Sequence, residues 1–261
     1  DATAIYLLGD IFDFWFEYRR VVPQGFVRVL GRFAELSRRG VELVFYTGNH
    51  DMWCYDYLER ECGMRIVYTP QVESVGHLRL HLAHGDNMNI TGQPMLRLMN
   101  AFFRSHIARV VFSWVVHPDL ALKFGRWWSG KSRKAHLSRM ARKSDCDRPL
   151  IPNKLSILID YARSHRAKNV GVDAYLFGHM HHPYDFNDDI RVVFLGDWLG
   201  DVAYYAVLDD KHLELKTFNI DETKVINMYQ TCYQISDILM QVINKIEGCE
   251  ATVVERFLDP R

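Results

Sequence analysis

The sequence has few cysteines, and nothing in their arrangement suggests cross-linking. The 261 residues include five cysteines, and no two of them form a Cys-x-x-Cys pair. An odd number of scattered cysteines argues against a disulfide framework and against a structural zinc knot, and it fits a reducing cytosol. The five are Cys54, Cys62, Cys146, Cys232 and Cys249.

Long apolar runs and an excess of charge of one sign are also missing. The longest apolar stretch, VVFSWVV at residues 110–116, is far shorter than the roughly 20 residues that span a bilayer. The 32 basic residues balance the 32 acidic ones, so no general attraction to nucleic acid is expected. The first residues show no signal-peptide pattern. We therefore expect a cytoplasmic protein with no membrane span, no nucleic-acid partner and no obligate protein partner, although attachment to a membrane surface stays open.

What the sequence does contain is a set of short apolar runs that end in polar residues. Runs of this length without alternation are typical of strands covered on both faces. Residues 23–40 lie between the first two runs, have apolar residues at helical spacing and end at Gly40, so they predict a helix. Strand, helix and strand in this order predict an α/β fold. The four runs are AIYLLGD (4–10), VELVFYTGNHD (41–51), LRLHLAHGD (78–86) and DAYLFGHMHH (173–182).

The remaining segments complete a prediction of one domain over residues 1–261. After Gly178 the pattern predicts an antiparallel meander of RVVFLGDW, VAYYAVLDD and LELKTF, and residues 221–247 predict one long amphipathic helix. Residues 88–168 are helical in pattern and rich in aromatic and basic side chains. We interpret them as an inserted helical cap over the mouth of the sheet; the alternative is that these helices cover a sheet face.

The polar residues that follow the four strands predict a metal centre. Reactive groups of open α/β sheets gather at the carboxyl ends of the strands, and imidazole with carboxylate suits Mn, Fe, Zn or Ni. His179 and His181 can address two cations about 3.5–4 Å apart, with Asp10 bridging them, and two such cations activate a shared water. A lone residue of this kind is usually structural, but four strand ends in order make a strong pattern.

The series GD, GNHD, HG and GHxH resembles the calcineurin-like metallophosphoesterase superfamily. Within it, GDIFDFW, FLGDW and an apolar helical insertion are similar to the UDP-2,3-diacylglucosamine pyrophosphatases of lipid A synthesis. The resemblance implies a sandwich of mixed sheets flanked by helices and two divalent metal ions, with manganese first and Fe, Zn or Ni as alternatives. It also implies an acylated sugar-nucleotide substrate and a place at the inner face of the bacterial inner membrane.

The resemblance also assigns roles to individual residues. Asp10 would bridge the two metals, and His181 would belong to the first site. Asn49, His84 and His179 would complete the second site. His50 would contact the phosphoryl or leaving oxygen, and Asp51 would fix the tautomer of His50. Asp13 is either a further supporting residue or a surface residue, whereas Asp86 and His182 are expected to be structural.

Two departures from the family pattern leave alternatives open. The family begins with a strand carrying Asp-x-His, which normally lies within the sheet, and no such motif precedes Asp10. The first metal site would then keep only Asp10 and His181, which permits a metal-poor scaffold that binds partners. Well-known members carry Arg in place of His50, which gives weight to a phosphodiesterase acting on another nucleotide or lipid phosphate.

The predicted cap combines apolar helix faces with the basic stretch RWWSGKSRKAHLSRMARK at 126–143. Buried apolar helices suit acyl chains, at roughly 0.8 kcal/mol per buried methylene. Arg126, Lys131, Arg133 and Lys134 are candidates to hold a diphosphate by charge-assisted hydrogen bonds, and the alternative is an ordinary solvated basic face. The apolar residues are Leu96, Met99, Phe102, Phe103, Val110, Val111, Phe112 and Trp114.

Overall fold

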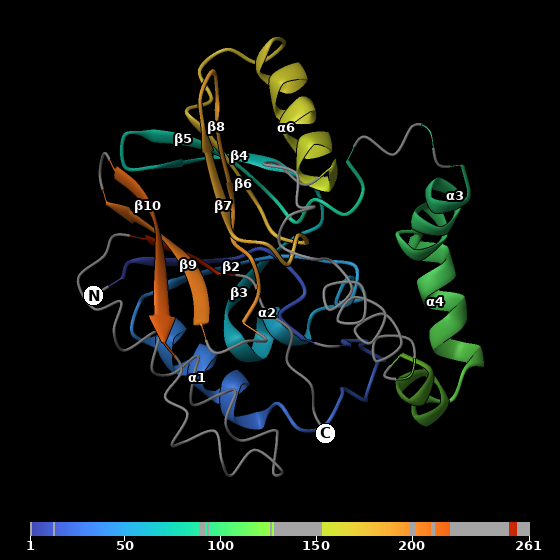
Figure 1. Ribbon diagram of the computed structural model, residues 1–261. Coiled ribbons are helices and arrows are strands. Elements are labelled where there is room, and N and C mark those ends of the chain that lie inside the picture. Colours follow the sequence, from blue (N-terminus) through green and yellow to red (C-terminus); the bar gives the residue numbers. More distant parts are fainter. Residues whose placement is uncertain are drawn as a thin grey trace.

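Two β-sheets form the centre of the molecule (Figure 1). The computed structural model describes residues 2–12, 14–88, 92, 94–125, 127, 153–198, 202–209, 212–219 and 251–254. In these residues the strand order is β10-β9-β11-β1-β2-β3 in the first sheet and β4-β5-β6-β8-β7 in the second. Both sheets mix parallel and antiparallel pairs, so the predicted α/β fold with mixed sheets flanked by helices is confirmed.

In the first sheet, β1 pairs in parallel with β2 on one side and with β11 on the other, in the register Ala4↔Ala251. The strand β11 also pairs antiparallel with β9, so it fills the position between β1 and β9. The predicted crossover from β1 through α1 to β2 is present. The strands are β1 (Ala4–Leu7), β2 (Glu42–Tyr46), β3 (Met64–Val67), β9 (Val202–Asp209), β10 (His212–Asn219) and β11 (Ala251–Val254).

The second sheet is built around β6, which pairs in parallel with β5 and β8. The predicted meander after Gly178 is only partly right, because β8 belongs to this sheet whereas β9 and β10 belong to the other. The chain therefore leaves the second sheet after β8 and enters the first sheet at β9. The strands are β4 (Gln71–Val75), β5 (Leu78–Ala83), β6 (Ala174–Phe177), β7 (Tyr184–Asn187) and β8 (Arg191–Phe194).

The two faces of each sheet are buried against different partners. Tyr6 on β1 faces the second sheet and packs with Leu82 and Leu176, whereas its neighbour Leu7 packs with Phe33 of α1 on the outer face. This alternation explains why the strands are apolar without a break. Helices α1 (Val27–Arg38) and α2 (Tyr57–Cys62) cover the outer face of the first sheet. In the described part of the chain, Cys54 and Cys62 are free and buried.

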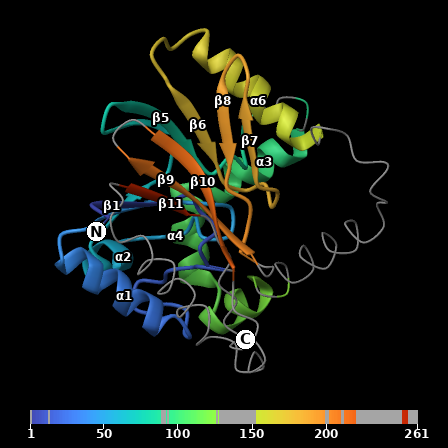
Figure 2. The ribbon, with the colours of Figure 1, turned by 60° about the vertical axis from the view of Figure 1, so that its left-hand side comes forward.

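The helix α6 (Asn153–Arg166) covers the outer face of the second sheet (Figure 2). Its residues Leu158 and Ile159 pack with Phe177 and Phe194. The sequence pattern places this helix in the predicted cap, residues 88–168. The apolar side chains of α6 instead serve the alternative role, the covering of a sheet face.

The described part of the cap is therefore smaller than expected. It consists of α3 (Pro94–Phe103), α4 (His106–Val115) and helical residues 118–125, which stand to one side of the two sheets (Figure 1, green). The predicted basic contacts Arg126, Lys131, Arg133 and Lys134 and the predicted helix 221–247 lie outside the described residues.

Candidate functional site

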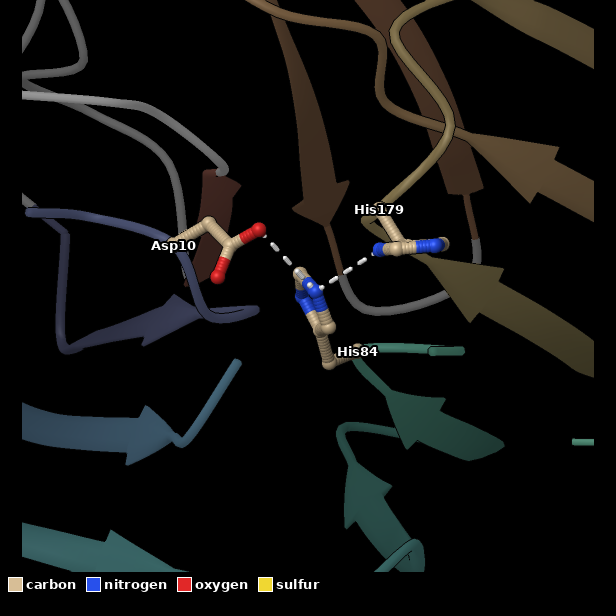
Figure 3. A group of neighbouring side chains, drawn as sticks. All are labelled: Asp10, His84 and His179. Carbon is tan, nitrogen blue, oxygen red and sulfur yellow. Dashed lines mark hydrogen bonds and ion pairs between the residues drawn. The ribbon is translucent and has the colours of Figure 1, made fainter. Parts of the chain in front are cut away.

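The polar residues after β1, β2, β5 and β6 meet at one end of the two packed sheets. Asp10, His84 and His179 come from three of these strand ends, and their side chains point toward one another (Figure 3). One ligand atom from each lies within 4.8 Å of the others. The predicted convergence of these three residues is present in the structure.

His84 stands at the centre of this group. Its Nδ1 lies 2.8 Å from the carbonyl oxygen of Leu8, and because a carbonyl oxygen can only accept, Nδ1 carries the proton that is donated there. The Nε2 atom lies 3.2 Å from Asp10 Oδ2, from Asn49 Oδ1 and from His179 Nδ1. Four atoms with lone pairs thus converge around one point, which is the donor arrangement that a cation requires.

Asp10 is held in an unusual backbone conformation. Among the described residues, Asp10 (φ 51°) and His179 (φ 57°) are the non-glycine residues with positive φ. Such strain concentrates at functional sites, where the surrounding structure enforces it. The buried Asp10 carboxylate also accepts the His50 backbone N–H at 2.8 Å through Oδ1. Asp10 is therefore fixed by two strand ends at once.

The glycines of the GD and GNHD motifs are required because there is no room for a side chain at these positions. A Cβ on Gly9 would lie 2.6 Å from His84 Nδ1, and a Cβ on Gly48 would lie 2.2 Å from Asp10 Oδ1. Neither neighbour can move without displacing the cluster. These two glycines let the two strand ends approach closely enough for Asp10 to reach His84.

Electrostatics sets the protonation of the cluster. Burial by itself would raise the pKa of Asp10, but the nearby imidazoles of His84 and His50, in their protonated forms, outweigh it and lower that pKa below its usual value. Burial, followed by the charge of His84, lowers the pKa of His179 to about 4. Near neutral pH, Asp10 is ionised and His179 is neutral, the states in which both bind metals.

Asp51 has a structural role that we did not predict. Its carboxylate is fully buried and accepts backbone N–H groups from Gly48, Asp10, Ile11 and Phe12 at 2.7–3.4 Å. It therefore ties the turn after β2 to the turn after β1, and its role in orienting the His50 ring stays a prediction. Burial and then the charge of Asp10 raise the pKa of Asp51 to about 7.

The other candidate residues lie around this cluster. His181 Nδ1 lies 3.0 Å from a carboxylate oxygen of Asp197, a residue that we did not predict; its signal was the third repetition of Gly-Asp, at 196–197. The His50 side chain is half-buried and His182 is exposed. Asp86 forms an ion pair with Arg104, and Asp13 lies outside the described residues.

Comparison with known proteins gives the family. No family model matches the chain. It is 41% identical over 228 residues to UDP-2,3-diacylglucosamine hydrolase of Porphyromonas gingivalis, covering 83% of this chain and 84% of that relative. Identity to the enzymes of the same name is 24% over 214 residues in Haemophilus influenzae, with 80% and 82% covered, and 26% over 210 residues in Neisseria meningitidis serogroup B, with 80% and 81% covered.

Solved structures are more distant. An archaeal phosphodiesterase shares 11% identity at a TM-score of 0.35, with 82% of this chain and 99% of that chain covered. The assignment therefore depends on the sequence relatives. With 41% identity across most of both sequences, the chain belongs to the UDP-2,3-diacylglucosamine hydrolase family.

Proposed function

We propose that this chain hydrolyses the pyrophosphate bond of UDP-2,3-diacylglucosamine and releases UMP and 2,3-diacylglucosamine 1-phosphate. The observation that carries the proposal is the convergence of Asp10, Asn49 and His179 on Nε2 of His84. The relatives named for this substrate supply the substrate class.

The donor set fits a divalent cation of the borderline group, because it combines imidazole nitrogen with carboxylate and amide oxygen. Asp10, Asn49, His84 and His179 would hold one ion, and His181 with a shared Asp10 would hold the second. We put manganese first and Fe, Zn or Ni as alternatives. Bound metal of this kind supplies a water of lowered pKa and neutralises charge on phosphoryl oxygens.

The protein side chains prepare this site for the phosphate. His84 donates its Nδ1 proton to Leu8, which keeps Nε2 free for a ligand role. The backbone N–H of His50 fixes the Asp10 carboxylate. We assign the His50 ring, half-buried at the rim of the cluster, to hydrogen bonding with the phosphoryl or leaving oxygen. Asp51 supports it by holding both turns in place.

The helices α3 and α4 are proposed to hold the acyl chains and to rest on the membrane surface. Large apolar side chains on them are exposed, which on a soluble surface marks a binding region. No helix among the described residues is long and apolar enough to cross a membrane. Attachment to the inner face of the inner membrane, with Arg126, Lys131 and Arg133 near the diphosphate, remains part of the proposal. The exposed residues include Met95, Leu98, Phe102, Ile107, Val111, Trp114 and Val115.

The test is an assay of the protein with UDP-2,3-diacylglucosamine in detergent micelles, with Mn²⁺ and after removal of metal by chelation. We expect UMP to form only with metal present. Hydrolysis of a small phosphodiester without any release of UMP would favour a phosphodiesterase for another substrate. Failure to retain metal after equilibrium dialysis would favour the scaffold.

A further inference from the structure

The α3–α4 hairpin, residues 94–115, is attached to the rest of the protein with little burial of its own side chains. No described side chain of α3 or α4 is buried. Between α3 and the turn after β5 lies an open groove of about 560 Å³, lined in part by Asn87, Arg97 and Asn100. The rings of Phe103 and Phe112 do contact Trp53, at centroid distances of 5.9 and 5.1 Å. Beside the groove, polar contacts add to this aromatic packing.

Several of these contacts lead to the segment that follows the GNHD turn. The indole N–H of Trp53 donates to the Phe103 carbonyl, and Arg109 donates to the Cys54 carbonyl. Arg109 also lies over the Tyr55 ring, 4.3 Å from its centroid. These contacts fix the side of the hairpin that is nearest to the end of β2.

One contact leads to the turn that carries His84. Arg104, the residue after α3, donates from Nη2 to both carboxylate oxygens of Asp86 at 2.8 and 2.9 Å. Its Nη1 donates to the Tyr68 carbonyl at 3.2 Å. One guanidinium thus joins the hairpin, the segment after β3 and the turn after β5.

Burial makes this ion pair different from the other arginine–aspartate pairs of the described chain. The Asp86 side chain is 5% exposed and that of Arg104 is 24% exposed, whereas Arg163 and Asp189 are 44% and 50% exposed. A buried carboxylate needs its cationic partner. Asp86 also lies only two residues beyond His84, so it couples the position of the hairpin to the strand end that carries a cluster residue.

We propose that Arg104 and Asp86 form a positioning pair that holds the α3–α4 hairpin in register with the metal cluster, and that this register sets how well acylated substrates are used. The proposal rests on the proposed function for the identity of the substrate. Arg104 acts through the hairpin and not on the reacting phosphate. Loss of the pair therefore affects a substrate that spans hairpin and cluster more than one that reaches the cluster alone.

The experiment compares Arg104→Gln, Arg104→Lys and the parent on UDP-2,3-diacylglucosamine and on bis(p-nitrophenyl) phosphate, a small soluble diester. For Arg104→Gln we expect KM for the acylated substrate to rise about tenfold or more, because misplacement of a substrate-positioning element is costly. We expect kcat/KM for the small diester to change less than about threefold, and the manganese content to stay the same. Arg104→Lys keeps the positive charge but lacks the several donor nitrogens of the guanidinium. Its KM for the acylated substrate should therefore lie between those of Arg104→Gln and the parent.

The matched control is Arg163→Gln, which breaks an arginine–aspartate pair of the same donor–acceptor distances, 2.8 and 2.9 Å, on α6. It should leave both substrates unchanged. Equal losses on both substrates in Arg104→Gln, or no loss on either, would overturn the proposal.

A second measurement keeps the pair testable if the acylated substrate is not turned over. Amide hydrogen exchange over residues 94–115 should be faster in Arg104→Gln than in the parent, and unchanged in Arg163→Gln. Unchanged exchange in Arg104→Gln would refute the positioning role whatever the substrate. Faster exchange without any UMP release by the parent would refute the proposed function and leave the positioning of the hairpin in place.

Discussion

The cluster of Asp10, His84 and His179 and the α3–α4 hairpin are built on opposite principles. Asp10 and His84 are buried, sit at strand ends and are bonded to backbone groups of neighbouring strands. The hairpin buries none of its described side chains and presents Trp114, 79% exposed, to solvent. Under the proposed function the contrast separates two tasks: chemistry requires fixed donors, whereas recognition of a flexible lipid tolerates an adaptable apolar surface. Changes in the two regions should therefore affect different kinetic constants.

The largest effect is expected at the cluster. Asp10→Ala removes a carboxylate whose Oδ2 faces His84 and whose Oδ1 accepts from His50. Hydrolysis of both the acylated substrate and a small aryl phosphodiester should be abolished, while far-ultraviolet circular dichroism stays that of the parent. Activity within about tenfold of the parent, the effect of a supporting residue, would remove Asp10 from the metal-binding role.

His50 tests how far the cluster's function extends beyond its metal ligands. His50→Ala keeps the backbone N–H that holds Asp10 but removes the ring, so turnover should fall by roughly 10²–10⁴, the usual contribution of a positioned proton donor. Metal content, measured by plasma emission spectroscopy, should not change. Loss of metal in this variant would mean that the ring serves the metal and not the phosphate.

A third region, the interface of α6 with the second sheet, shows how burial changes the pKa of a histidine that has no part in the proposed catalysis. His81 on β5 is 2% exposed, and around it lie Tyr161 and His165 of α6 and Tyr175 of β6. Burial, followed by the charge of His165, lowers the pKa of His81 from 6.5 to about 4. Burial lowers the pKa of His165 in the same direction.

Folding therefore favours neutral His81, and the unfolded chain binds more protons between pH 6.5 and pH 4. Above about pH 6.5 the free energy of unfolding is not affected by the protonation of this histidine. As the pH falls from 6.5 to 4, the free energy of unfolding decreases by up to roughly 3 kcal/mol. The measurement is the urea midpoint of the parent and of His81→Phe from pH 4 to pH 8. The parent should lose more stability than the variant on acidification, and parallel curves would contradict this account.

The smallest effect is expected on the exposed face of the hairpin. Trp114→Ser removes apolar area that only a lipid can use, so KM for UDP-2,3-diacylglucosamine should rise by about tenfold or less, which corresponds to one or two unburied methylenes. The matched control is Val170→Ser, which changes a residue that is 89% exposed and lies after α6. An equal response of both variants would show that the hairpin face has no special part in substrate use.

The sequence indicated the cluster well because its signal is local. Each strand is a short apolar run and each ligand follows directly, so the edge where Asp10, His84 and His179 meet could be predicted before their distances were known. The role of Asp51 could not, because its four backbone donors come from two turns far apart in sequence. Likewise, nothing local distinguishes α6 from the cap helices; only the packing of Leu158 against Phe177 does.

The position of β11 bears on how the protein is made. Ala4 pairs with Ala251, and β9 pairs with the same strand from the other side, so two inner strands of the first sheet wait for residues 251–254. At ribosomal speeds of about 5–20 residues per second, that delay is on the order of tens of seconds for β1 and of seconds for β9. Until β11 is made, β1 has an unpaired backbone edge, and β9 has one from the time it is made. The late arrival of the last described strand therefore leaves an inner part of the first sheet open to edge-to-edge association during synthesis.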